Sequence, residues 1–181
     1  MTHNNSTSNH VVIVGGGVAG LEALLALRAL AGESISLTLA APRNWFVDRP
    51  MTVAEPFGLG SPARLSLPEV TAECGAEFVR GTVVAVDVAN RRVSCADAPD
   101  LDFDTLILAS GARARAPFSD AITFGFEGSG HAIREMLARL RNGEARSVAF
   151  VAPAMTGWVL PLYELALMTA RELAESDVDG V

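Results

Sequence analysis

The glycines at positions 15, 17 and 20 are the residues of this sequence whose spacing most directly suggests chemistry. They spell G-x-G-x-x-G, with Val18 and Ala19 between the last two. In such a motif the first glycine permits a tight turn, the second lets a phosphate approach the backbone, and the third lets a helix pack closely on a strand. A helix that begins here points N–H groups and its positive dipole end at that phosphate. Gly15, Gly17 and Gly20 therefore predict a binding site for the pyrophosphate of a dinucleotide.

The segments on either side of the glycines have the pattern that such a site requires. Residues 11–14 read Val-Val-Ile-Val, which predicts a strand buried on both faces. Residues 18–31 are apolar nearly all round and predict a helix enclosed in an α/β core, which Gly32 ends. This order favours a dinucleotide site over the alternative, a glycine-rich turn without a ligand.

The next strand, expected at residues 34–40, departs from the dinucleotide fingerprint. The end of this strand commonly carries an acid that binds a ribose hydroxyl, but Ala41 and Pro42 occupy that place here. Arg43 follows, and an arginine at this point either binds the 2′-phosphate of NADP or is solvated. Ribose recognition is therefore in question, and an NADP-binding module that uses Arg43 is one interpretation.

A long loop is expected at residues 44–68. It is rich in proline, glycine and aromatic residues, and the aromatic residues argue against disorder. Two interpretations are equally open: the loop forms a wall around a flat ring system, or it covers the edge of the sheet. Residues 68–74 then predict one short helix.

The later sequence predicts mainly β structure, followed by helices. A strand is expected at residues 77–81, an antiparallel meander at residues 82–95 and a buried strand at residues 105–109. That strand ends in Ala109-Ser110-Gly111, where small residues again allow close approach of a ligand. A helix at residues 130–140 and a strand at residues 147–152 follow.

Residues 153–158 do not repeat the glycine motif, because they contain only Gly157. Trp158 either fills the place of a second pyrophosphate or packs in the core, and we expect core packing. Residues 158–170 are too few for a membrane span and predict a buried helix, which starts near Pro161 and extends to about residue 175.

Composition argues against several classes of partner. The 181 residues carry 14 Lys and Arg against 21 Asp and Glu, and the net charge of −7 argues against nucleic acid and anionic membranes. Cys74, Cys95 and the three histidines form no metal or redox pattern, so no metal site is predicted. The polar tail, residues 1–9, lacks a signal-peptide core and is expected to be disordered. We expect a cytoplasmic protein without a transmembrane segment.

The order of these segments resembles the FAD domain of the pyridine nucleotide-disulfide oxidoreductase superfamily. Within it, the sequence is similar to the branch of type II NADH dehydrogenases and sulfide:quinone oxidoreductases. The similarity rests on the glycine motif, on residues 42–46 with Arg49-Pro50, and on residues 104–112. Ala109-Ser110-Gly111 matches that family's second FAD motif, usually Ala-Thr-Gly. The resemblance covers residues 10–115 well and the later residues more loosely.

The resemblance implies an α/β fold: a Rossmann-like FAD-binding domain with a parallel sheet and an inserted antiparallel β-meander, plus the first β-α unit of a second dinucleotide-binding domain. The expected division is a tail at 1–9, the FAD-binding domain at 10–115, a connecting segment and helix at 116–145, and the incomplete start of an NAD(P)H-binding domain at 146–181.

The resemblance also implies cofactor contacts at particular positions. The glycine motif would hold the FAD pyrophosphate, and Thr82 and Val83 would offer backbone groups to the adenine. Ser110 and Gly111 would line the cofactor near its phosphates, and Arg49-Pro50 would lie near the flavin ring. The expected cofactor-binding residues are Gly15, Gly17, Val18, Ala19, Gly20, Ala41, Pro42, Arg43, Arg49, Pro50, Thr82, Val83, Ala109, Ser110 and Gly111.

The function implied by the resemblance is an FAD-dependent oxidoreductase that passes electrons from NAD(P)H or another donor through the flavin to a quinone or other acceptor. No catalytic side chain is assigned, because the cofactor carries the chemistry. The family's third FAD segment has no counterpart in the sequence, so we expect a truncated or partial chain. The alternative is a non-catalytic dinucleotide-binding remnant or a subunit that needs a partner chain. Expected partners are a small-molecule electron donor and acceptor, with either a homo-oligomer or a missing C-terminal half.

Overall fold

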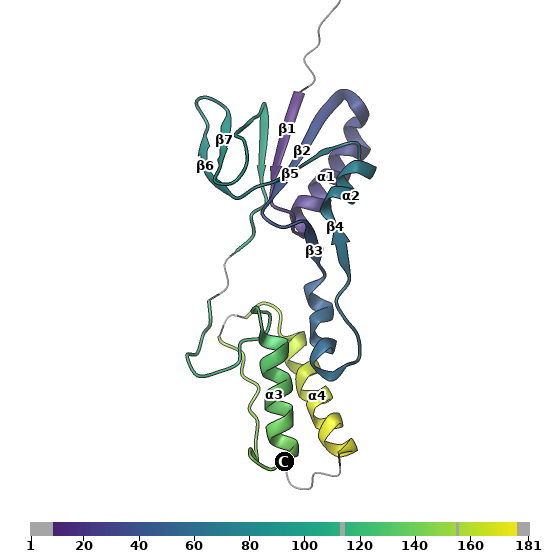
Figure 1. Ribbon diagram of the computed structural model, residues 1–181, viewed down its shortest axis with the longest axis vertical. Helices are drawn as coiled ribbons and strands as arrows, with labels where there is room; N and C mark the ends of the chain where they lie inside the picture. The colour runs from purple at the N-terminus through teal and green to yellow at the C-terminus, as the bar shows by residue number, and fades with distance from the viewer. Residues whose placement is uncertain (1–8, 113–114, 155, 177–181) are drawn as a thin grey trace, which may run out of the picture. The chain divides into compact units, whose positions relative to one another are not determined.

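The computed structural model describes residues 9–112, 115–154 and 156–176 (Figure 1). The chain divides into two compact units, the first made of residues 1–46 and 64–113 and the second of residues 47–63 and 114–181. Residues 47–63 therefore group with the later part of the chain and not with the sequence on either side of them. The tail expected at residues 1–9 lies outside the described residues except for Asn9, which begins the first strand.

The first unit is built on a four-stranded parallel sheet with the strand order β5-β2-β1-β9. The central strand β1 (Asn9–Val14) pairs with β2 (Ile35–Ala41) on one side and with β9 (Thr105–Leu108) on the other. β2 pairs in turn with β5 (Glu77–Arg80). The chain runs outward from β1 to β5 and returns to the other side at β9, so β1 lies at the switch point where parallel sheets commonly bind ligands.

The strand β1 is buried on both faces, as its sequence predicts. Val11 and Ile13 pack with Leu24 of helix α1 (Val18–Ala31) on one face of the sheet. Val12 and Val14 pack on the other face, against the antiparallel strands. Figure 1 shows α1 and α2 (Leu67–Glu73) on one side of the sheet and strands β6 and β7 on the other. Because successive side chains of β1 point to opposite faces of the sheet, this one apolar run contributes to the hydrophobic core on each face.

Helix α1 has the predicted bounds but buries only one face. Leu21 and Leu24 are buried, whereas Val18, Leu25 and Leu30 are exposed. The expectation of a helix enclosed all round is therefore wrong. The sheet covers one side of α1, and nothing among the described residues buries these three side chains.

The meander predicted at residues 82–95 is confirmed, and a third strand that was not predicted extends it to an antiparallel sheet in the order β6-β7-β8. Its strands are β6 (Val83–Asp87), β7 (Arg92–Cys95) and β8 (Leu101–Asp102). Val93 of β7 is fully buried and anchors the meander on the parallel sheet. The Nε of Arg92 donates to Asp102 at 2.7 Å and joins the middle strand β7 to the outer strand β8 at their surface.

The segment at residues 44–68 contains regular structure that the sequence did not predict. Strands β3 (Trp45–Val47) and β4 (Arg64–Ser66) form a two-stranded sheet, and the 3-10 helix η2 (Arg49–Phe57) lies between them. No run of alternating apolar and polar residues in this segment is long enough to predict these elements from periodicity. Val53 of η2 is buried in the core of the second unit, so this part of the segment has a packing role.

The second unit packs helices α3 (Ser129–Arg141) and α4 (Leu160–Glu175) with η2. Both helices lie close to their predicted positions. The strand predicted at residues 147–152 is wrong: these residues have no regular structure and join none of the sheets in the described part of the chain. A strand requires a hydrogen-bonded neighbour, and Phe150 instead packs on the helical cluster.

Trp158 also differs from its prediction, because its side chain is 54% exposed and does not lie in the core. The loop from residue 153 to α4 supplies no enclosing layer for it in the residues described. The helix predicted as buried at residues 158–170 begins at Leu160 and buries one face only.

Candidate functional site

The carboxyl ends of β2, β1 and β9 meet at the glycine turn. The Gly15 N–H donates to the Ala40 carbonyl oxygen at 2.8 Å, and the Ala109 N–H donates to the Val14 carbonyl oxygen at 2.7 Å. The glycine motif and the Ala109-Ser110-Gly111 segment, which are far apart in the sequence, are therefore neighbours at one edge of the sheet. The family resemblance implied that both segments lie near the cofactor phosphates, and the parallel pairing of β1 with β9 places them side by side.

Gly15 and Gly20 are glycines because the protein packs tightly around them. A Cβ at Gly15 would lie 2.2 Å from the Ala109 carbonyl oxygen, and its φ of +118° also disfavours other residues. A Cβ at Gly20 would lie 1.8 Å from the Gly15 carbonyl oxygen. These contacts are with backbone, which has no freedom to give way. Both glycines are required for the strand–turn–helix junction whether or not a ligand binds.

Gly17 differs, because no contact in the described part of the chain requires a glycine there. A Cβ at Gly17 would have no atom within 4 Å, and its φ of −90° and ψ of −172° are ordinary for an extended residue. Gly17 is the N-cap of α1, and no side chain caps this helix. An exposed helix N-terminus with open space at its N-cap fits a phosphate group that comes close to the backbone. The dinucleotide pyrophosphate therefore fits the residues that are present.

The end of β9 offers a second open position beside the glycine turn. Ser110 and Gly111 are exposed, and a Cβ at Gly111 would have no atom within 4 Å. The φ of Gly111 is +71°, a left-handed conformation that turns the chain away from the sheet edge. Ser110 and Gly111 thus leave the edge unobstructed next to Gly15.

The end of β2 carries no acid where the fingerprint expects one. Ala41 is buried, and its carbonyl oxygen accepts a hydrogen bond of 3.0 Å from the Gly81 N–H. Pro42 and Arg43 follow outside the strand and are exposed. The small side chain at Ala41 is packed beneath the turn, since a Cβ at Gly16 would lie 3.1 Å from the Ala41 Cβ.

Thr82 lies beside this strand end, but its backbone is already bonded. The Thr82 N–H donates to Asp97 Oδ1 at 2.6 Å, and the Thr82 carbonyl oxygen accepts from the Ala96 N–H at 2.9 Å. The Thr82 N–H is therefore engaged within the meander. Val83 begins β6 opposite Cys95, and its contact with an adenine stays a prediction.

Two residues that position the site escaped the sequence analysis. Leu67 is 1% exposed, and a Cβ at Gly16 would lie 2.4 Å from its Cδ1, so Leu67 supports the glycine turn from behind. Gly81 is buried against the meander loop, where a Cβ would lie 2.9 Å from the Cβ of Ala98. Gly81 could have been identified from the sequence, because it is a glycine at the end of a predicted strand. No feature of the sequence marked Leu67.

The other predicted residues and the titratable groups add little to this edge. Arg49 and Pro50 are exposed in η2 and belong to the second unit, so their contact with a flavin ring stays a prediction. Burial raises the pKa of the half-buried Cys95 thiol, and the carboxylates of Asp100 and Asp97 raise it further. A raised pKa disfavours the thiolate and hence nucleophilic chemistry at Cys95.

Comparison with known proteins places the chain in one family. Residues 9–151 match the family of pyridine nucleotide-disulphide oxidoreductases. The chain belongs to this family. Within the described residues no three His, Cys, Asp or Glu side chains gather as metal ligands would. Likewise, none of the helices in that part of the chain combines the length and apolar character needed to cross a membrane.

Three relatives show how far this similarity extends. The chain is 31% identical over 112 residues to the ferredoxin–NAD(+) reductase subunit of the benzene 1,2-dioxygenase system from Pseudomonas putida, covering 60% of this chain and 27% of that subunit. Its fold is similar to a sulfide:quinone oxidoreductase from Aquifex aeolicus, with a TM-score of 0.80, 22% identity and coverage of 94% and 41% of the two chains. A water-forming NADH oxidase from Lactobacillus brevis gives a TM-score of 0.65, 19% identity and coverage of 90% and 37%. The chain spans less than half the length of each relative.

Proposed function

We propose that this family member binds FAD at the glycine turn and acts as an oxidoreductase that passes electrons from NAD(P)H or another donor to a quinone or other acceptor. The observation that carries the proposal is the open, uncapped N-terminus of α1 at Gly17, next to the unobstructed end of β9. Family membership favours a flavin dinucleotide among the ligands that this edge fits.

Each part of the edge would have a distinct role in binding. The backbone N–H groups of Val18 and Ala19, in the first turn of α1, would donate to the pyrophosphate, because no side chain caps them. Ser110 and Gly111 would flank the same phosphates from β9. Because Ala41 offers no carboxylate to the ribose, we expect weaker ribose contacts than in dinucleotide sites that carry an acid.

When bound, the flavin would supply the redox chemistry by accepting electrons from the donor and returning them to the acceptor. The donor and acceptor are suggested by the names of similar proteins. A reductase subunit is named for NAD(+), and one oxidase structure contains NADH. A third similar protein is named for a quinone. We extend these to the present chain as a proposal, together with a cytoplasmic location and with residues 146–181 as the start of an NAD(P)H-binding domain.

Anaerobic reduction of the purified, flavin-loaded chain tests this function. NADH or NADPH should bleach the visible flavin absorbance, and a soluble quinone should restore it. Each donor is added to free FAD in a parallel cuvette as the control. A chain that binds FAD but is reduced by neither nicotinamide cofactor, and by no other donor, is not an oxidoreductase by itself.

One observation favours a second candidate, a dinucleotide-binding chain without turnover. Residues 147–152 form no strand, and residues 153–158 lack the glycine motif that would bind a second dinucleotide. Such a chain would bind FAD through the first unit and would require a partner chain for electron transfer. Restoration of bleaching by an added protein fraction would favour this candidate, whereas bleaching by NADH alone would exclude it.

A further inference from the structure

The outward face of α4 carries an apolar seam that no described residue covers. The seam consists of Leu160, Tyr163, Leu167, Ala170 and Ala174, all of which are exposed. Tyr163 is 62% exposed and Leu167 is 71% exposed. The five positions are spaced three and four residues apart in alternation, which is the spacing of helices that pair along a seam.

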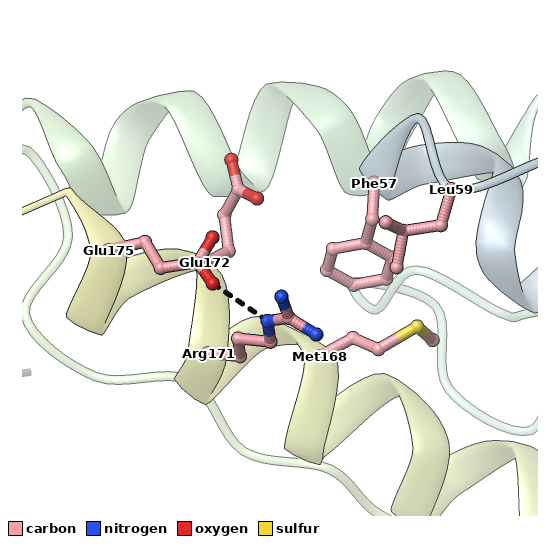
Figure 2. Close-up of a pocket in the computed structure, with 6 residues that line it drawn as sticks. All are labelled: Phe57, Leu59, Met168, Arg171, Glu172 and Glu175. Carbon is pink, nitrogen blue, oxygen red and sulfur yellow. Dashed lines mark hydrogen bonds and ion pairs between the residues drawn. The ribbon is translucent and has the colours of Figure 1, made fainter.

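The seam is separate from the face that α4 uses within its own unit. Leu165 is buried in the cluster that contains Val53 and Ile133, and Leu173 is buried on the same side of the helix. Figure 2 shows side chains that line a pocket on the flank of α4, where Met168 lies near Phe57. The helix is therefore apolar on two sides, and its own unit accounts for only one of them.

The side chains of the seam are ordered by size, so that the seam is complementary to a second copy of itself that runs in the opposite direction. The large residues Leu160 and Tyr163 lie at the start of the helix, and the small Ala170 and Ala174 lie at its end. In an antiparallel pair centred on Leu167, Leu160 faces Ala174 and Tyr163 faces Ala170. Large residues opposite small ones allow two helices to interdigitate. A two-fold symmetric interface requires this kind of self-complementarity.

The charges beside the seam have the same symmetry. Glu164 and Arg171 lie seven residues apart, so they share one flank of the seam. In the antiparallel pair each Glu164 faces Arg171 of the other copy, which gives two opposite-charge contacts. The Arg171 Nε donates a hydrogen bond to Glu175 Oε1 at 2.7 Å, and Figure 2 marks this contact with a dashed line. A guanidinium has five donors and is able to bind a second carboxylate as well.

We propose that two copies of this chain dimerise through the α4 seam, with the helices antiparallel and the two-fold axis at Leu167. A parallel pair would place Glu164 and Arg171 opposite the other flank, where Ala166 and Leu173 carry no charge. Because α4 has 16 residues, it is only about 24 Å long. The interface is therefore small, and the dimer is weak and depends on concentration.

Sedimentation equilibrium of the full chain over a wide range of concentration tests the proposal. The wild-type chain should dimerise reversibly. Leu167→Glu places two like charges at the axis and should raise the dissociation constant about tenfold or more. Leu30→Glu is the matched control, because Leu30 is 87% exposed on α1 and lies outside the seam. A chain that stays monomeric throughout, or dimers that tolerate Leu167→Glu, would overturn the proposal.

The charged pair gives a test that misfolding cannot imitate. Glu164→Arg and Arg171→Glu should each weaken the homodimer, because each variant opposes like charges twice. An equimolar mixture of the two variants should regain wild-type association, because every contact across the mixed pair then joins opposite charges. If both variants associate weakly and the mixture does too, the antiparallel arrangement is wrong. The reference is an equimolar mixture of the wild-type chain and the Leu167→Glu variant. If the mixture of the two charge variants associates no more strongly than this reference, the antiparallel arrangement is also wrong.

Discussion

The carbonyl oxygen of Gly15 lies 1.8 Å from the position that a Cβ of Gly20 would occupy, so the first turn of α1 rests directly on the glycine turn. Gly17, between them, has open space at the same position. Two glycines of the motif are thus required by the packing of the protein, while the third leaves room for a ligand. We therefore expect stability and ligand binding to depend on different residues of this short motif.

Gly20→Ala should damage the fold itself. The added methyl group would overlap a backbone oxygen, and overpacking of this kind costs about 1–3 kcal/mol or more. Urea unfolding should show a lower midpoint with or without FAD. The comparison variant is Gly130→Ala in α3, whose Cβ would meet Glu55 only at an ordinary 3.8 Å. Equal midpoints for the two variants would mean that the α1 junction is looser than the structure has it.

Gly17→Ser should separate binding from stability. The extended backbone at Gly17 suits a serine N-cap, so the hydroxyl would accept from a free N–H of α1 and hold stability level or raise it slightly. The same side chain would fill the open space and would bind backbone N–H groups that we expect to donate to the phosphate. FAD affinity should therefore fall about tenfold or more. Unfolding and flavin titration of the same sample measure both effects. A variant that loses stability in step with affinity would show that Gly17 has a packing role.

The first unit could be predicted well because its signals are local. The Val-Val-Ile-Val run, the glycine spacing and the meander each appear as patterns within a few residues, and the structure has β1, α1, β6 and β7 where these patterns indicate. The position of Ala109 beside Gly15 was not predicted, because the pairing of β1 with the distant strand β9 is not visible in a local pattern. Leu67 could not be predicted, because a single leucine in a long segment carries no periodicity.

Cys95 should react slowly with thiol reagents in the native protein. Burial and the nearby Asp100 and Asp97 raise its pKa above the ordinary value of 9.0, and only the thiolate reacts. In a Cys74→Ser background, alkylation of the native chain should lag behind that of the urea-unfolded chain near neutral pH. The sign follows because a thiol with a raised pKa has less thiolate at any pH below that value. Asp100→Asn should speed the native reaction, and an unchanged rate would remove Asp100 as a cause.

Arg28→Lys should destabilise the junction of α1 and α2. The Arg28 Nε donates to the Cys74 carbonyl oxygen at 2.6 Å, and an NH2 group donates to the Gly75 carbonyl oxygen at 3.0 Å. Another terminal nitrogen bonds the Gly32 carbonyl oxygen. A lysine cannot reproduce this fork, and we expect a loss of about 1–3 kcal/mol in the free energy of unfolding. Arg80→Lys, at an exposed strand end, is the control, and similar losses in both variants would contradict the assignment.

The second unit was harder to predict because its structure depends on contacts between distant segments. Residues 147–152 have the composition of a strand, but strand formation needs a neighbour that a local pattern cannot supply. Trp158 is exposed for a related reason, because hydrophobicity alone does not say whether another layer covers a side chain. The periodicity of a helix is a local signal and does not depend on such contacts, so α4 has the predicted bounds. Its burial depends on other segments and differs from the prediction.

The most direct test of the central claim is a titration of the purified chain with FAD, followed by visible absorbance and flavin fluorescence. Wild-type chain should take up FAD with a shifted flavin spectrum, Gly130→Ser should do the same, and Gly17→Ser should bind at least about tenfold more weakly. Uptake of FAD that is equal in all three would place the cofactor elsewhere. A folded wild-type chain that takes up no FAD would contradict the account, because the open edge at Gly17 would then have no flavin to bind.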